Sequence, residues 1–412
     1  AVFTLASLGC GLSTSLGMLI AMRAVQGIGA ALMTPQSMAL ITRTFPPDRR
    51  GAAMGLWGAT AGVATLVGPV AGGVLVDAFG WESIFFVNIP VGIAGFVLAT
   101  MLVPRLETTP HRFDMLGVAL SAVALFLLVF GLQEGETFSW GMIWGPISVW
   151  SLIVSGVALL GVFIWQQART TSEPLVPLDL FRDRNFSVSN LAIWAVGVAV
   201  TSMSLPMMFY LQLGRGLTPT EAALLTIPTA VLSGVLSPLA GRLLDRTDPR
   251  YLLVPGLLLV GGGQFWYGML MRADTPMLMF LLPAALIGIG SAGMWGPLAT
   301  TATRNLPRHQ AGAGAGIYNT TRTIGSVVGS AAIAALMQSR LQANLPGAAA
   351  DAGFGSGPLP SFVVEGFSAA MSQSMLLPSA AMLVGLVTVL FIRRAGVAAP
   401  APSRPAEAEV SA

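Results

Sequence analysis

The sequence predicts an all-α polytopic membrane protein, with two pseudo-symmetric six-helix bundles and two linking helices. Three observations predict this fold. Of the 412 residues, 54% are hydrophobic and only 9% are charged, and the mean hydropathy is +0.75. A soluble domain could not bury so much apolar surface. Segments long enough to cross a bilayer recur along the chain, and the glycine spacing of one segment returns 261 positions later, from Gly51 to Gly312. Parallel repeats of this kind are typical of secondary transporters.

Twelve apolar segments have spanning character, although the first is too short to cross. They lie at about 1–12, 16–42, 52–76, 83–103, 115–132, 147–167, 187–211, 220–242, 251–271, 276–303, 311–337 and 374–392. The second copy of the repeat opens with the segments at 187 and 220, whose counterparts would precede Ala1. We therefore expect the first two helices and part of a third to be absent from this chain. The intact protein would have fourteen helices, with six in each bundle and two that link the bundles.

The segment from Gly51 to Asp77 is unusually rich in glycine for a helix. Small residues at four-residue spacing allow two membrane helices to approach closely. In the second copy, Gly312, Gly316 and Gly329 fall on Gly51, Gly55 and Gly68, and Gly325 falls on Ala64. The segment is therefore expected to pack closely against neighbouring helices.

Four regions follow from these segments. Residues 1–103 are the remainder of the N-terminal bundle, 104–168 hold the two linking helices, 169–394 form the C-terminal six-helix bundle, and 395–412 form a disordered tail. The connection from about 338 to 373 is rich in Gly, Ala, Pro and Ser, and is expected to be mostly irregular with room for a short surface helix.

Arginine predicts the orientation of the chain. Sixteen arginines occupy alternate connections and the C-terminal tail, whereas the opposite connections hold only Arg215, Arg272 and Arg340. The richer side is expected to be cytoplasmic, and the C-terminus with it. We therefore expect a multi-pass protein of the bacterial inner membrane.

Other classes of protein are disfavoured. The net charge of +3 is too small and scattered for nucleic-acid binding. An enzyme would need convergent acidic, His or Cys side chains, yet His111 and His309 lie in cytoplasmic connections and Cys10 is alone. We expect no enzymatic activity, no metal, no cofactor and a monomeric chain. No cleavable signal peptide is apparent in residues 1–12.

Several stretches resemble the 14-helix drug:proton antiporter branch of the major facilitator superfamily. LIAMRAVQGIGAAL, with Arg23 and Gln26, resembles the fourth-helix motif of that branch. The GPxxGG of its antiporter motif is matched in the fifth helix, although an earlier glycine of the motif is Ala64 here. GRLLDRTDPR is similar to the second-half version of the cytoplasmic gating loop, with Asp248 where a glycine is expected. The residues concerned are Gly68, Pro69, Gly72 and Gly73 in the antiporter motif, and Gly241, Asp245, Arg246 and Arg250 in the gating loop.

The resemblance implies a secondary exporter of hydrophobic or amphipathic organic compounds, such as drugs or antibiotics. It implies proton antiport and alternating access, with a small-molecule substrate, protons and the lipid bilayer as partners. Two alternatives stay open: a transporter of the same fold for an amino acid or siderophore, and a non-transporting membrane sensor.

Arg23 and Arg322 are the charges inside predicted spans. A charge in the bilayer costs at least about 2.5 kcal/mol, so each is expected to face a cavity or a partner. With Gln26, they are candidates for transport and coupling; the alternative is that each is a structural donor. A guanidinium does not deprotonate in this range, so the proton needs a carboxylate. We expect that carboxylate in the absent helices.

Further candidates concern the gate and the cavity. Asp245 is expected to meet the positive N-terminus of the helix that starts near Gly51 and, with Arg246, to latch the cytoplasmic ends of the two bundles; the alternative is a charge pair that merely fixes topology. A kink at Pro69 could seal the cavity edge, or the segment could simply pack closely. Polar and aromatic candidates for the cavity lining, each of which could instead be packing, are Trp57, Trp194, Trp295, Tyr318 and Asn319.

Overall fold

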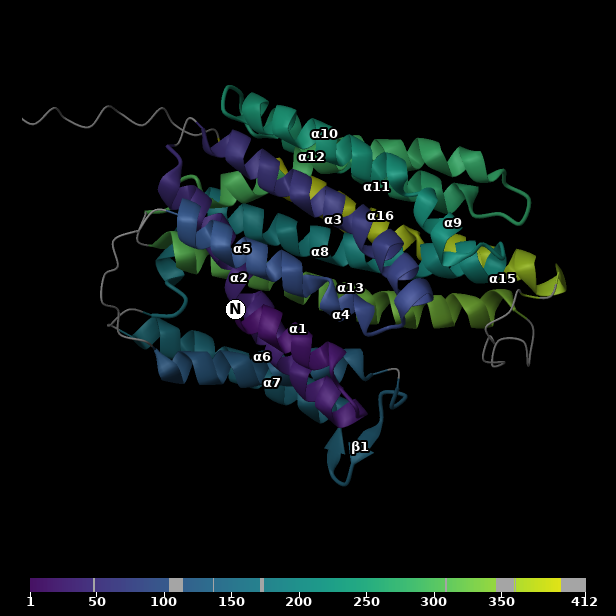
Figure 1. Ribbon diagram of the computed structural model, residues 1–412, viewed down its shortest axis with the longest axis horizontal. Coiled ribbons are helices and arrows are strands. Elements are labelled where there is room, and N and C mark those ends of the chain that lie inside the picture. The colour runs from purple at the N-terminus through teal and green to yellow at the C-terminus, as the bar shows by residue number, and fades with distance from the viewer. Residues whose placement is uncertain are drawn as a thin grey trace, which may run out of the picture.

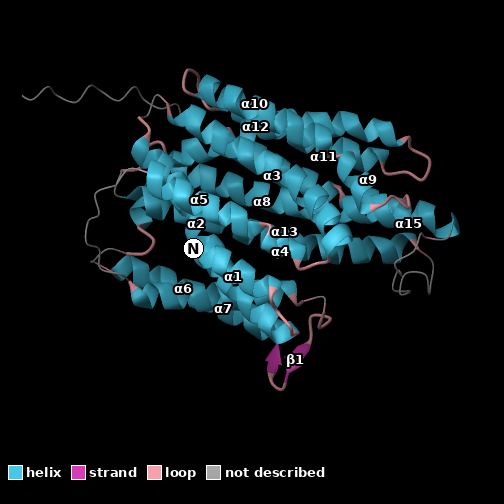
Figure 2. Ribbon diagram, in the orientation of Figure 1, coloured by secondary structure: helices cyan, strands magenta, loops and turns pink. Residues whose placement is uncertain are grey.

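The computed structural model describes residues 1–46, 49–103, 114–135, 137–170, 174–307, 310–345, 359 and 361–393. Almost all of them lie in long helices that run in roughly one direction (Figures 1 and 2). Ten helical segments among the described residues are long and apolar enough to cross a membrane. The short helix α1 (Val2–Gly11) and the 30-residue helix α3 (Arg50–Phe79) complete the predicted set of twelve.

The first half and the linking pair contain seven helices and a small hairpin among the described residues. Besides α1 and α3 they are α2 (Leu16–Thr44), α4 (Ser83–Phe86), α5 (Asn88–Leu102), α6 (Met115–Gln133), β1 (Met142–Trp144), β2 (Ile147–Ser148) and α7 (Val149–Arg169). The second half has α8 (Arg184–Phe209), α9 (Pro219–Leu224), α10 (Ile227–Leu244), α11 (Arg250–Leu270), α12 (Leu281–Thr303), α13 (Ala311–Asn344), α15 (Ser361–Ser374) and α16 (Leu376–Val389), with short turns η1 (Leu178–Arg182), η2 (Tyr210–Gly214) and η3 (Met277–Phe280).

Polar side chains begin several of these helices. Ser15 accepts a hydrogen bond from the backbone N–H of Met18, and Asp183 accepts one from that of Phe186. Each satisfies a helix N–H that has no partner within its own helix. At α9, Thr218 and Glu221 form a reciprocal capping box.

The buried core lies mainly in the second half, among α8, α11, α12, α13, α15 and α16. The first half contributes Met38 from α2 and Met54 from α3, both fully buried. Helix α3 lies beside α10, α13 lies beside α8, and α6 pairs with α7 in a hairpin. The two halves therefore meet along α3 and α10, with further contacts from α3 to α12 and from α2 to α13.

The connection at 338–373 was predicted to be mostly irregular, but its described ends are helical, which corrects the prediction there. Helix α13 continues to Asn344, and α15 begins at Ser361 and joins α16 in a span from Phe362 to Val389. Helix α15 was not recognised as part of a span because serines and Gln373 lower its hydrophobicity. Its apolar face is nevertheless buried, with Phe367 and Met371 fully inaccessible. Residues 346–358 lie outside the described residues.

The region boundaries stay predictions. Residues 104–113 and the tail predicted at 395–412 lie outside the described residues. The hairpin β1–β2 between α6 and α7 was not predicted, because three residues paired with two give too short a pattern to recognise in sequence.

Candidate functional site

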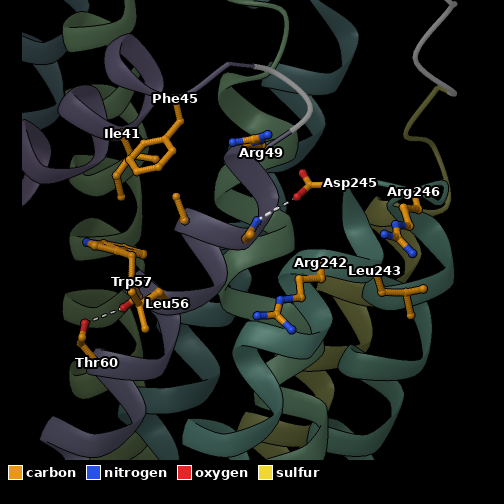
Figure 3. A pocket seen from close by; sticks show the side chains of 12 residues that line it. Ile41, Phe45, Arg49, Leu56, Trp57, Thr60, Arg242, Leu243, Asp245 and Arg246 are labelled. Carbon is orange, nitrogen blue, oxygen red and sulfur yellow. Dashed lines mark hydrogen bonds between the residues drawn. The ribbon is translucent and has the colours of Figure 1, made fainter.

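Asp245 joins the two halves at the end where α3 begins and α10 ends, which we call the arginine-rich end. One carboxylate oxygen accepts the backbone N–H of Gly51 at 2.7 Å, and the other accepts that of Ala52 at 3.1 Å. These N–H groups belong to the first turn of α3, where the helix dipole favours a negative charge. The structure thus shows the contact expected between Asp245 and the N-terminus of this helix (Figure 3).

Glycine allows this approach. A Cβ atom at Gly241 would collide with the carbonyl of Gly51, and one at Gly51 would collide with the Asp245 carboxylate and the Gly241 carbonyl. One turn further, a Cβ at Gly55 would meet the Ser237 carbonyl. The backbones of α3 and α10 are therefore in direct contact over two turns, as close glycine packing in membranes allows.

A cavity of about 1270 Å³ lies beside this contact (Figure 3). Its walls come from α2, the first turns of α3 and the last turns of α10, with arginines near one end and apolar side chains further along α3. The lining residues are Ile41, Phe45, Arg49, Ala52, Ala53, Leu56, Trp57, Thr60, Arg242, Leu243, Asp245 and Arg246. Of the predicted cavity residues, only Trp57 is among them.

Trp295 and Asn319 lie at two further contacts between the halves. A Cβ at Gly58 of α3 would lie 3.6 Å from the Cβ of Trp295 in α12. Asn319 on α13 is buried, donates to the Ala315 carbonyl at 2.9 Å and lies 4.0 Å from the sulfur of Met38 on α2. Trp57 and Trp295 both pack against the main core. These residues are in the region where the halves meet, as a central site requires.

Arg23 and Gln26 form a separate polar group. Arg23 donates to the Gln26 Oε1 at 2.9 Å, and its guanidinium lies 5.8 Å from the centre of the Phe85 ring. Gln26 is buried, whereas Arg23 is exposed. Within the described residues, no carboxylate pairs with Arg23 or with Arg322. The guanidinium of Arg23 is therefore held by a neutral amide and an aromatic ring.

The remaining aromatic candidates lie where α8 meets α13. Trp194 is half-buried, and its carbonyl fills the space beside Gly325. The Arg322 carbonyl in turn fills the space beside Gly197, and the Arg322 side chain is half-buried. Tyr318 is buried, and its hydroxyl has no hydrogen-bond partner. An unpaired buried hydroxyl is costly, which makes Tyr318 a candidate for contact with water or a ligand.

The antiporter-motif residues lie in the second half of α3. Gly68 and Gly72 have open space where a Cβ would be. Pro69 and Gly73 lie within the bounds of the helix, but their side-chain positions are outside those described. The gating-loop residue Arg246 lies exposed on the cavity wall, and Arg250 begins α11 with its backbone N–H bonded to Asp248 Oδ1 at 3.0 Å.

A polar cluster that the sequence did not reveal ties α6 to α7. The N-cap Asp114 accepts from the Gly117 backbone at 2.8 Å and from the Gln167 side chain at 2.6 Å. Gln166 donates to the same carboxylate at 3.3 Å. The Gly117 hydrogen bond and those from Gln167 and Gln166 hold the pKa of Asp114 below its ordinary value of 3.8, against the opposing effect of burial. The sequence feature that could have predicted this cluster is the pair Gln166 and Gln167, which lies near the end of an apolar segment.

Among the described residues, no group of three or more His, Cys, Asp or Glu side chains is placed to hold a metal ion.

Known proteins similar to this chain are transporters. A protein described as an uncharacterized MFS-type transporter of Mycobacterium tuberculosis is 50% identical over 95% of this chain, which spans 68% of that relative. The tetracenomycin C resistance and export protein of Streptomyces glaucescens is 30% identical over 95% of the chain and 78% of its own length. The multidrug export protein EmrB of Escherichia coli is 31% identical over 80% of the chain and 64% of its own length. The chain thus spans between about two thirds and three quarters of these relatives.

Solved structures with the same fold include the proton:xylose symporter XylE and the human organic anion transporter MFSD10. XylE superposes with a TM-score of 0.55 at 16% identity, covering 95% of this chain and 78% of XylE. MFSD10 superposes with a TM-score of 0.54 at 15% identity, covering 92% of this chain and 74% of MFSD10. At such identity the likeness shows the fold alone. Residues 1–330 match the Major Facilitator Superfamily, and together with these relatives this shows that the chain belongs to that family of membrane transporters.

Proposed function

We propose that this protein exports hydrophobic or amphipathic organic compounds, including antibiotics, in exchange for protons. Two kinds of support converge. Relatives at about 30% identity are named for resistance to, or export of, tetracenomycin C and multiple drugs. The antiporter-type glycine motif at Gly68 and Gly72 is typical of exporters in this family and disfavours uptake.

The observation that carries the proposal is the contact between Asp245 and the first turn of α3. It links one half to the other through two charge-assisted hydrogen bonds, each worth about 1.5–3 kcal/mol. Water can replace both partners when the halves separate, so the contact can form and break. Alternating access needs such a reversible closure at one end of the cavity.

In this scheme the arginine-rich end faces the cytoplasm of a bacterial cell, as does the C-terminus. The state with Asp245 bound to α3 is closed to the cytoplasm. When the contact between Asp245 and α3 breaks, substrate enters from the inner leaflet or the cytoplasm into a cavity that includes Trp295, Tyr318 and Asn319. The protein acts as a monomer, because one chain supplies both halves.

We assign proton coupling to Arg23 together with a carboxylate on an adjoining helix. Arg23 keeps its charge throughout, and can respond to the protonation of a nearby acid by exchanging partners. Its present partners, Gln26 and the Phe85 ring, are neutral. Since the partners of this guanidinium among the described residues are neutral, a charge in an apolar setting favours an acidic partner on an adjoining helix.

The test is the complete gene expressed in a bacterial host that lacks its own drug pumps. We expect the inhibitory concentration of some hydrophobic antibiotics or dyes to rise several-fold. This rise should become smaller when the proton gradient is collapsed. Matched expression of Asp245→Ala should abolish the rise. No change of tolerance to any compound in a broad screen, at confirmed membrane expression, would overturn the proposal.

A further inference from the structure

We propose that the hairpin β1–β2 binds the lipid bilayer at the membrane boundary opposite the arginine-rich end. Its tip, residues 142–147, enters the layer between the phospholipid headgroups and the first methylene groups of the acyl chains. The inference concerns how the linking pair α6–α7 is held in the membrane, and it does not depend on the proposed export.

The tip is apolar and exposed. Its sequence, MIWGPI, contains no polar side chain. Trp144 and Ile147 pair across the two strands, so their side chains lie next to each other on one face of the hairpin. The exposed fractions are 80% for Trp144, 61% for Met142 and 41% for Ile147. The described part of the chain therefore leaves these three apolar side chains largely uncovered.

The length of α7 places the hairpin at the membrane boundary. This helix has 21 residues, and at about 1.5 Å per residue its length matches the roughly 30 Å of the hydrocarbon core. Near its arginine-rich end the guanidinium of Arg169 lies 4.3 Å from the centre of the Trp165 ring, and both side chains are exposed. Such a pair is typical of one membrane boundary. The first residue of α7, Val149, then lies at the opposite boundary, directly after β2.

The hairpin runs sideways from that boundary. Figures 1 and 2 show that it projects away from the other helices and across their direction. A hairpin directed along the helix axes would extend into water, whereas one directed across them stays at the depth of its base. The direction is fixed at the junction with α7, because Ser148 ends β2 and accepts a hydrogen bond from the backbone N–H of Ser151 at 3.1 Å.

The base of the hairpin is rigid. The Trp140 indole fills the space beside Gly135 at the end of α6, and its ring centre lies 5.7 Å from that of Trp150 in α7. The backbone N–H of Trp140 donates to the Gly135 carbonyl at 2.7 Å, and that of Val149 donates to the Gly141 carbonyl at 3.0 Å. The tip is thus held in place before it meets lipid, so that little conformational entropy is lost on binding.

The bilayer boundary fits this tip better than water does. Residues 137–168 contain no charged side chain, so the hairpin and α7 offer no ionic group that would draw them into water. An exposed tryptophan in water carries a hydrophobic cost. At the headgroup level the same ring buries its apolar body while its indole N–H can still donate a hydrogen bond.

A protein partner, including a second copy of this chain, fits less well. Stable protein interfaces bury about 800 Å² on each side and use roughly 20–30 residues of each partner. The tip has only residues 142–147 to offer, and it projects away from the rest of the molecule. Lipid needs no such area, because it surrounds the hairpin from several sides.

Binding to lipid would give the linking pair an attachment that it otherwise lacks at this end. Among the described residues, α7 packs against α6, and α6 lies beside α13. At the arginine-rich end the Asp114 carboxylate ties the two helices together through Gln167. At the opposite end the hairpin joins them and holds both to the membrane boundary.

Fluorescence quenching of the complete gene product in liposomes tests this assignment. In a Cys10→Ser background, a fluorophore is attached to Pro146→Cys at the tip or to Asp274→Cys, an exposed polar position after α11 at the same end. Phospholipids brominated near the top of their acyl chains should quench the fluorophore at 146 several-fold more than the one at 274. Iodide in the water should show the reverse order.

Two results would overturn the proposal. Equal iodide quenching at both positions, without quenching by the brominated lipid, would mean that the tip lies in water. Protection at 146 from both quenchers that disappears when the protein is diluted in lipid would mean that a second copy covers the tip.

Removal of the apolar side chains gives a second readout. Met142→Ser together with Trp144→Ser should raise iodide quenching of the Pro146→Cys fluorophore several-fold, because the tip then gains less by staying in lipid. Val162→Ser, at an exposed position near the other end of α7, is the matched control and should leave the quenching unchanged. None of these side chains packs in the core, so the variants should fold. Unchanged iodide quenching in the double serine variant contradicts the proposed binding.

Discussion

Gly241 and Gly51 lie backbone to backbone where α10 meets α3, with no side chain between them. At the arginine-rich end the halves are thus joined by main-chain surfaces and by the carboxylate of Asp245. This makes the contact sensitive to a single methyl group, and suggests the first of four tests.

Gly241→Ala should prevent the closed arrangement from forming fully. The added methyl group would overpack the contact by about 1–3 kcal/mol, which shifts a two-state equilibrium by roughly 5- to 150-fold. Drug tolerance in the pump-deficient host should fall accordingly. Gly262→Ala, where space is open, is the matched control. Full export by Gly241→Ala would show that this close approach is not needed.

Asp245→Asn should weaken the closure without adding bulk. An amide can accept one of the two hydrogen bonds, but it lacks the charge that the N-terminus of α3 favours. We expect a loss of about 1–2 kcal/mol in the closed state, since neutral hydrogen bonds are weaker. The measurement is the rate at which a thiol reagent labels the Thr60→Cys variant, whose cysteine lies on the wall of the adjoining cavity. An unchanged rate, together with unchanged export, would refute the latch.

Arg23→Gln should uncouple transport from the proton gradient. The substitution removes the fixed charge, while glutamine can still hydrogen-bond within the helix. Arg23→Lys, which keeps a charge but loses the planar geometry, should retain part of the activity. The measurement is substrate efflux from proteoliposomes with and without an imposed pH gradient. Equal gradient dependence in all three proteins would remove Arg23 from the coupling scheme.

Asp114→Asn should lower the thermal stability of the purified protein at pH 7 and have a smaller effect at pH 3. Because the pKa of Asp114 is lowered in the folded protein, its contribution is complete above the unfolded-state pKa of about 3.9 and is lost as the pH falls through the folded-state pKa. The measurement is the midpoint of thermal unfolding in detergent at both values.

Asp179→Asn is the control for this test. Asp179 pairs with Arg182 at 3.1 Å, but both side chains are more than three quarters exposed, so the pair adds little stability. A pH-independent difference between the Asp114 variant and the unchanged protein would contradict the assignment.

The features predicted well from sequence depend on short-range rules. Asp245 was placed against α3 because a carboxylate at one helix end and a helix N-terminus at another attract each other. The four-residue spacing of glycine predicted close packing of this helix, which holds at Gly51 and Gly55 where they meet α10, but not at Gly68 and Gly72, which have open space. Membrane spans were recognised because every backbone polar group in lipid must be paired within a helix.

The features that were missed depend on tertiary contacts. Helix α15 mixes serine and glutamine with Phe367 and Met371, and only packing shows which face is buried. The hydrogen bonds from Gln166 and Gln167 to Asp114 were not predicted, because the sequence does not show that the end of α7 lies beside the start of α6. The open surroundings of Gly68 also needed coordinates, because sequence gives the glycine but not its neighbour.

The hairpin β1–β2 extends from the α6–α7 pair, away from the other helices (Figure 1). Its Trp144 is 80% exposed and takes no part in the contacts between halves. A reporter group attached at this tip would show which compartment the hairpin faces in intact cells. The sidedness of the whole chain could thus be established at a position outside the contact between α3 and α10.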